Sequence, residues 1–172
     1  MASTSSREVK RLYHTFLDFE VEERAETRIV VPQKVYNPHR PALAAPCTPV
    51  DFKTYGQLGF NLQSAYDKQQ DGLEDAAQIC HLTDGDKSVA IRIQWPGYGK
   101  LQSKMKLKNP TKLSIASTVA ERVEAHIRKM KTTEPTEECR DWDINNFDLC
   151  DMYLLRLEHV STGSWQPILS VG

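Results

Sequence analysis

The sequence predicts an α+β fold, in which a mostly antiparallel sheet of about five to seven strands packs against one main amphipathic helix over residues 114–131. Two observations predict it. Stretches of alternating apolar and polar residues lie on both sides of a single long helical pattern, and a strong turn signal joins two of them into a hairpin. The 172 residues suit one hydrophobic core. We therefore expect a flexible N-terminal arm at 1–10 and a single domain over 11–172.

The composition is that of an ordinary globular protein. Hydrophobic residues make up 40% and charged residues 26% of the chain, which excludes a chain that is disordered throughout. The formal net charge of −1 excludes a uniformly basic protein. Any contact with nucleic acid must therefore use a local patch of cations.

The sequence lacks membrane and secretion signals. No run approaches the roughly 18 apolar residues that cross a bilayer, and the N-terminal residues lack the apolar core of a secretory signal. The cysteines are widely spaced and expected to be reduced thiols; they are Cys47, Cys80, Cys139 and Cys150. These features predict an intracellular protein, cytoplasmic or nuclear, with no membrane partner.

Residues 16–36 are predicted to form two strands. In the first, acidic and apolar residues alternate, which predicts a half-buried strand with an acidic outer face. One side has Phe16, Asp18, Glu20 and Glu22, and the other has Leu17, Phe19 and Val21. The second strand is expected over 27–36, where Pro32 favours a sheet edge because proline cannot donate to a ladder. The two strands can pair across the polar link between them.

Residues 37–49 hold four of the nine prolines and are predicted to be an extended, proline-rich connector. A docking peptide for a proline-recognising domain is the alternative, and the plain connector is the favoured interpretation.

Two shorter helices are expected after the connector, over 55–70 and 73–80. The first rests on a helical stripe of apolar residues, which two internal glycines weaken. The stripe consists of Leu58, Leu62, Ala65 and Tyr66.

The central stretch, residues 87–120, contains seven Lys or Arg residues and no Asp or Glu. Its first half predicts a hairpin, because two alternating stretches flank a turn of proline and glycine at 96–99. The apolar, inward positions are Val89, Ile91, Ile93 and Trp95, followed by Leu101, Ser103, Met105 and Leu107. Lys104, Lys106 and Lys108 fall on the outward face.

The helix over 114–131 has the clearest pattern in the chain. Apolar residues recur with a period of 3.6 residues, at Ala116, Val119, Ala120, Val123, Ile127 and Met130. Thr111 or Ser114 is expected to cap its first turn. We expect this helix to pack across the inner face of the hairpin.

The residues after the helix reverse the sign of the charge. Residues 132–151 contain seven acidic residues and one basic residue, Arg140. They are predicted to form a solvated loop held in place by Trp142, Ile144 and Phe147.

Two strands complete the chain. The first is expected over 151–160, with Tyr153, Leu155 and Leu157 on one face. The second is expected over 165–171, where Pro167 favours an edge position.

The basic window supplies the candidate site. A row of cations on one surface is what a phosphate backbone requires, and an aromatic ring can stack on a base. The candidate residues are Arg92, Tyr98, Lys100, Lys104, Lys106, Lys108 and Lys112. The alternative is a solvated face whose lysines protect a sheet edge from aggregation. The acidic residues 132–151 can also fold over the lysines and neutralise them.

Three functional hypotheses follow. The leading one is a non-enzymatic binding module whose basic hairpin contacts nucleic acid or another acidic partner. The alternative is a protein–protein or self-assembly module that forms homo-oligomers through exposed edge strands. The third is a small thiol-dependent enzyme with Cys80 as nucleophile and His126 or His159 as base. No catalytic, phosphate-loop or metal-binding motif occurs, so we assign no catalytic residue, metal or cofactor.

Overall fold

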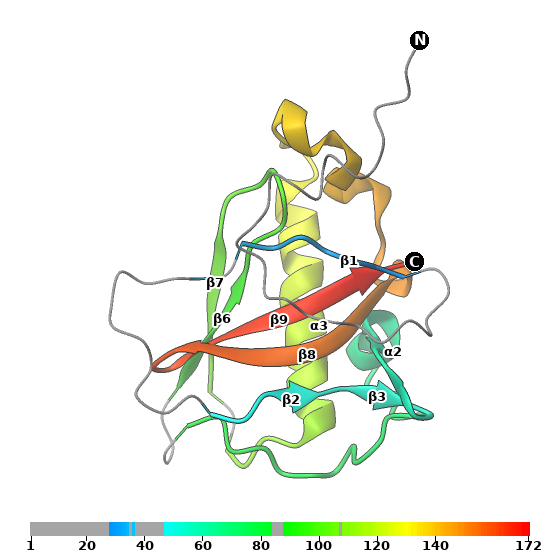
Figure 1. Ribbon diagram of the computed structural model, residues 1–172, viewed down its shortest axis with the longest axis vertical. Coiled ribbons are helices and arrows are strands. Elements are labelled where there is room, and N and C mark those ends of the chain that lie inside the picture. Colours follow the sequence, from blue (N-terminus) through cyan, green and yellow to red (C-terminus); the bar gives the residue numbers. More distant parts are fainter. Residues whose placement is uncertain (1–27, 35, 37–46, 84–87, 107) are drawn as a thin grey trace.

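The computed structural model describes residues 28–34, 36, 47–83, 88–106 and 108–172. It confirms the α+β class: a seven-stranded mixed sheet and a separate two-stranded sheet accompany the long helix α3. Figure 1 shows α3 running across one face of the larger sheet. The predicted strand at 16–22, the arm at 1–10 and residues 37–46 of the connector lie outside the described residues.

The elements follow one another in this order: β1 (Ile29–Val30), β2 (Val50–Asp51), β3 (Lys53–Thr54), β4 (Gln57–Leu58), β5 (Phe60–Asn61), α2 (Leu62–Tyr66), β6 (Val89–Ile93), β7 (Leu101–Met105), α3 (Lys112–Met130), the 3₁₀ helices η1 (Glu137–Trp142), η2 (Ile144–Asn146) and η3 (Leu149–Asp151), β8 (Met152–Ser161) and β9 (Ser164–Val171). Among the described residues, no helix is long and apolar enough to cross a membrane.

Two hairpins, β6–β7 and β8–β9, make most of the larger sheet, and α3 with the three 3₁₀ helices connects them. Its strand order is β2-β8-β9-β6-β7, with β1 also paired to β9 and β5 to β8. The pairing of β6 with β9 is parallel, whereas the other pairings in the sheet are antiparallel. The predicted hairpin at 89–107 is confirmed as β6 and β7, with Ile93 opposite Leu101 and Val89 opposite Met105.

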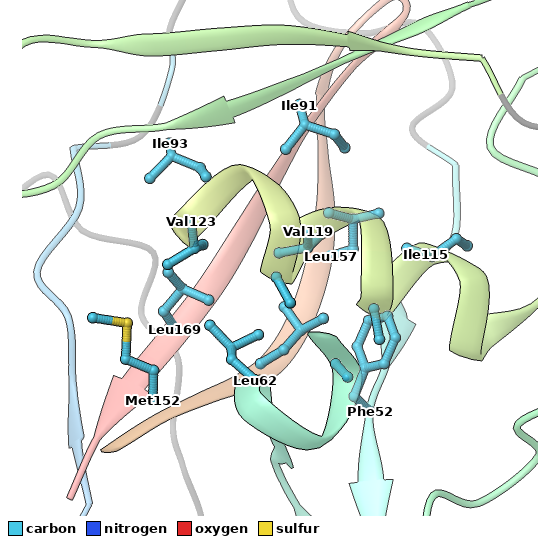
Figure 2. Close-up of a cluster of buried hydrophobic side chains, with 14 of the residues drawn as sticks. Phe52, Leu62, Ile91, Ile93, Ile115, Val119, Val123, Met152, Leu157 and Leu169 are labelled. Atoms are coloured by element: carbon cyan, nitrogen blue, oxygen red, sulfur yellow. The ribbon is translucent and has the colours of Figure 1, made fainter. Parts of the chain in front are cut away.

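Helix α3 forms and packs as the sequence predicts. The Thr111 hydroxyl accepts a hydrogen bond from the Ser114 N–H at 3.2 Å, which satisfies one of the free donors of the first turn. The apolar stripe meets the inner face of the sheet in a core that includes Ile91, Leu157 and Leu169 (Figure 2). Burying each large apolar side chain contributes about 1.5–3 kcal/mol.

The prediction of an edge position for the last strand is wrong, because β9 lies in the middle of the sheet. Strand β8 covers one side of β9, and β6 and then β1 cover the other. Pro167 lies between the two partners on that second side: Trp165 pairs with β6 and Ser170 with β1. Proline has no backbone N–H to donate. It is tolerated there because no backbone group on that side needs a hydrogen bond from this position.

The prediction that Tyr153, Leu155 and Leu157 share one face of β8 is also wrong. The register passes from Leu154 opposite Leu169 directly to Arg156 opposite Ile168, so Leu155 is an extra residue in a β-bulge. The bulge moves Leu154 rather than Leu155 onto the face of Leu157, and Leu154 belongs to the core. Alternation alone cannot reveal such an inserted residue.

The helix expected over 55–70 is mostly wrong. Tyr55 and Gly56 both adopt positive φ angles, 50° and 82°, and form the tight turn between β3 and β4. The helix begins only at Leu62, where the Asn61 side chain caps it, and α2 is five residues long. No helix forms over 73–80, where turns and isolated bridges take its place.

The strand predicted over 27–36 reduces to the two residues of β1, which pair with β9. The chain then continues alongside β9, where the buried side chain of Gln33 joins two strands. Its Nε2 donates to the Pro167 carbonyl at 2.7 Å, and its Oε1 accepts from the Gln94 N–H at 3.0 Å. Gln33 thus bonds backbone groups of β9 and of the residue after β6 where the two strands separate.

Replacement of Gln33 by Leu should destabilise the fold by about 2–4 kcal/mol, because the buried Pro167 carbonyl and the half-buried Gln94 N–H both lose their partner. Urea unfolding followed by circular dichroism measures the difference. Gln70→Leu, at an exposed glutamine, is the matched control and should change stability far less. Equal effects of the two substitutions would contradict the role of Gln33.

His126 is a buried polar residue on α3. It is 1% exposed, and neither ring nitrogen has a hydrogen-bond partner among the described residues. Burial lowers the pKa of His126 below its usual value, and the nearby charge of Lys129 lowers it further. The folded state therefore favours the neutral ring.

This lowered pKa predicts a loss of stability in acid. The unfolded chain binds a proton at His126 near pH 6.5 and the folded chain only at lower pH, so stability is complete above this range and falls as the pH drops through it. As the pH falls from 7.5 to 5, the parent protein should lose stability and His126→Leu should not, so the variant becomes more stable relative to the parent. The exposed His81→Leu is the control, and parallel stability profiles of parent and His126→Leu would refute the prediction.

Candidate anion-binding surface

Four exposed lysines lie along the outermost strand of the larger sheet and its two ends. Lys104 lies on β7 opposite Ala90 and points away from α3, whereas its neighbour Met105 is buried. Lys100 precedes β7, and Lys106 and Lys108 follow it. We call these four residues, Lys100, Lys104, Lys106 and Lys108, the cationic edge.

No acidic group of the described residues neutralises the cationic edge. Ion pairs involve other cations: Lys112 with Asp75, Arg128 with Glu124, Arg140 with Glu137, and Arg156 with Asp51 and Glu158. Within the described part of the chain, none of the four lysines has a carboxylate within 4.0 Å.

Arg92 adds a positioned charge beside the cationic edge. It lies on β6 opposite Gln102, and its Nη1 donates to the Gln102 side-chain oxygen at 2.7 Å. Its guanidinium also stacks 3.6 Å from the centre of the Tyr36 ring. These contacts hold Arg92 on the same outer face as Lys104. The sequence could not indicate Tyr36 as a contact because it lies far from Arg92 along the chain.

Tyr98 and Lys112 do not belong to this exposed row. The Tyr98 hydroxyl donates to Asp143 Oδ1 at 2.9 Å and accepts from the Ile144 N–H at 3.2 Å. Burial raises the pKa of Tyr98 above its ordinary value. Lys112 is buried in the first turn of α3, where its Nζ lies 3.8 Å from Asp75. Both residues therefore have structural contacts that occupy their polar groups.

The acidic segment 132–151 packs at the turn end of the β6–β7 hairpin (Figure 1). The Trp95 indole donates to the Trp142 carbonyl at 2.7 Å, and its ring meets those of Trp142 and Phe147 edge-on. Gly97 permits the approach, because a Cβ there would lie 2.7 Å from the Cys139 side chain. These contacts anchor the segment away from the middle of β7.

The described residues provide little support for thiol or metal chemistry. Cys80 is buried, and this burial raises its thiol pKa, which disfavours the nucleophilic thiolate. His159 Nδ1 accepts from the Cys47 N–H at 2.9 Å, and its ring packs against Trp165. Across the described ranges, no group of three or more His, Cys, Asp or Glu side chains is placed to hold a metal ion.

A second surface feature was not expected from the sequence. An open groove of about 430 Å³ lies between α2, the end of α3 and η3. Its lining mixes both signs of charge, with Glu124 and Arg128 paired to each other and Asp148 close by. Tyr66 ends α2, within the predicted helix, and lines this groove. The groove itself was not predicted, because α2, the end of α3 and η3 are distant from one another in the sequence.

Comparison of the chain with protein-family models, with curated proteins and with solved structures finds no match in any of the three.

Removal of the Tyr98 hydroxyl should loosen the acidic segment. Tyr98→Phe leaves Asp143 and the Ile144 N–H without this partner, and we expect a loss of about 1–3 kcal/mol in the free energy of unfolding. Tyr55→Phe, at a tyrosine that is 81% exposed, is the matched control. A Tyr98→Phe protein as stable as this control in urea would show that the hydroxyl does not hold the segment.

Proposed function

We propose that this chain is a non-enzymatic binding module whose cationic edge contacts an anionic partner, either nucleic acid or an acidic protein. The observation that carries the proposal is the row of exposed lysines on the outermost strand and at its two ends, none of them paired with a described carboxylate. Arg92 supports the same surface with a charge that is already oriented.

The contacts of the aromatic residues favour charge over base stacking. The Tyr98 hydroxyl is bonded to Asp143, and the Tyr36 ring is covered by the Arg92 guanidinium. A nucleic acid on this surface would then be held mainly through its phosphates, by release of counterions. Such binding depends little on sequence and falls steeply as the salt concentration rises.

Self-association through an edge strand is the second candidate. It is favoured by β7, whose outer side has no partner strand among the described residues. Strand β9, which the sequence suggested as an edge, is unsuited because both its sides are occupied. The exposed lysines of the cationic edge, on β7 and at its ends, oppose the pairing of two copies along this edge, since like charges would face each other.

The first test replaces three lysines of the cationic edge together, as Lys104→Gln, Lys106→Gln and Lys108→Gln. Binding to a fluorescent DNA duplex of random sequence should weaken by about tenfold or more at low salt. The slope of log affinity against log salt should fall by about three, one for each lost phosphate contact. Anisotropy titrations at several salt concentrations measure both, and a polyglutamate competitor reports binding of an acidic polypeptide.

The matched control removes three exposed lysines elsewhere, as Lys53→Gln, Lys68→Gln and Lys129→Gln. It makes the same change in net charge but should keep most of the affinity and slope. If the two triple variants bind DNA and polyglutamate equally, the cationic edge is not the binding surface.

A further inference from the structure

Strand β7 offers backbone hydrogen bonds as well as charge. It pairs with β6 along all five of its residues, from Leu101 to Met105, and no described segment pairs with its other side. An open strand edge presents N–H and C=O groups on which an extended polypeptide can add as a further strand. The register of the sheet decides which residues of β7 present these groups.

The hydrogen bonds of β6 identify them. The Ala90 N–H donates to the Gly163 carbonyl, just before β9, at 2.7 Å. Ala90 therefore points its backbone groups toward β9 and away from its partner on β7, Lys104. In an antiparallel pair of this kind both residues point their N–H and C=O away from each other, and residues two apart in one strand point the same way. The groups on the open side of β7 thus belong to Gln102 and Lys104.

The side chains of the same two residues lie on the outer face of the sheet. Gln102 and Lys104 are exposed, whereas their neighbours alternate toward the core: Leu101 and Ser103 are half-buried and Met105 is buried. In an added strand, the residue opposite Lys104 would lie about 5 Å away with its side chain on this outer face. A carboxylate at that position would pair with the Lys104 ammonium group.

Gln102 and Lys106 extend this preference to the neighbouring positions. The Gln102 side-chain oxygen already accepts from Arg92 at 2.7 Å, so its amide NH₂ is the group that remains to donate to a partner. Lys106 follows the end of β7 and is exposed. An acid at every second position of an added strand would therefore meet an amide donor, Lys104 and Lys106 in turn.

We propose that the cationic edge binds an acidic polypeptide in extended conformation, which adds to the open side of β7 as a further strand with an acidic residue at every second position. The inference rests on the proposed function, because it names the class of partner for the same lysines. Phosphate oxygens of a nucleic acid accept hydrogen bonds but do not donate them, so they would leave the outward carbonyls of Gln102 and Lys104 without a donor. A polypeptide backbone supplies both donors and acceptors.

The positions between the acids face the inner side of β7. Leu101 is only half-buried there and packs against the core, and Ser103 is half-buried beside it. Apolar residues of the partner at these positions would bury further apolar surface. A slip of one residue would turn the acids toward this side and the apolar residues toward the lysines. The edge therefore selects a polypeptide in which acidic and apolar residues alternate.

The first experiment compares two fluorescent peptides of equal composition and charge, both added to the full chain. In one, glutamate and valine alternate over eight residues; in the other, four glutamates precede four valines. The alternating peptide should bind about tenfold or more tightly in anisotropy titrations at low salt, because only it can place all its acids on the face of the lysines. Equal affinities of the two peptides would overturn the added strand.

The second experiment tests the backbone hydrogen bonds. Methylation of the glutamate backbone nitrogens blocks one side of the alternating peptide, and methylation of the valine nitrogens blocks the other. The glutamate amides face β7 in an antiparallel added strand and the valine amides face it in a parallel one. One methylated peptide should therefore bind about tenfold or more weakly than the other, and its identity gives the strand direction. Equal binding of the two methylated peptides would contradict the proposal, since charge alone does not distinguish them.

Hydrogen exchange measured by NMR places the added strand on β7. The Gln102 and Lys104 amides should exchange fast in the free protein and about tenfold or more slowly with the alternating peptide bound, because carbonyls of the peptide then accept from them. The Ser103 amide, which points toward β6, is the internal control and should be slow in both states. Slow Gln102 and Lys104 amides in the free protein would mean that the edge is already occupied and would overturn the proposal.

The Lys104→Gln, Lys106→Gln, Lys108→Gln protein separates this inference from the proposed function. If DNA and both peptides lose affinity in this variant but no peptide protects the outer amides of the parent protein, the proposed function stands and the added strand falls. If the alternating peptide protects these amides and binds the variant as tightly as the parent, the strand adds without help from the lysines, and both the proposed function and the selection of acids are wrong.

Discussion

The fold depends on the complete burial of strand β9. All eight of its residues are buried, so its backbone groups must find partners inside the protein. Strand β8 supplies them along one side, and β6 and β1 share the other. Where β6 and β1 leave a gap, the Gln33 side chain bonds the Pro167 carbonyl. Helix α3 then covers the apolar face of this arrangement. The position of β7 at the sheet edge follows from that order.

The separation of charge on the surface has a packing cause. The acidic segment after α3 carries four large aromatic or aliphatic side chains that are buried or half-buried, Trp142, Ile144, Phe147 and Leu149. Trp95 and the Tyr98 hydroxyl provide contacts for this segment at the turn end of the hairpin. Aromatic contacts and hydrogen bonds thus decide where these carboxylates lie, and attraction to the lysines does not. As a result, no described acid neutralises the cationic edge, although the chain as a whole is nearly neutral.

Open sheet edges are a general hazard, and lysines on them oppose unwanted pairing of copies. Under the proposed function, the same lysines would also attract an acidic partner, so protection of the edge and recognition of that partner would share one charge pattern.

The sequence alone determined the elements with strong periodicity: the β6–β7 hairpin, α3 with a cap at Thr111 or Ser114, and the outward facing of Lys104. Local spacing suffices there because each pattern repeats over several turns or residue pairs. Tertiary structure decided the rest. The central place of β9, the bulge at Leu155 and the burial of Lys112 depend on residues far away in the chain, as does the engagement of the Tyr98 hydroxyl by Asp143. Hydrogen-bond partners distant in sequence leave no trace in local periodicity, which is why these features appear only once the chain is folded.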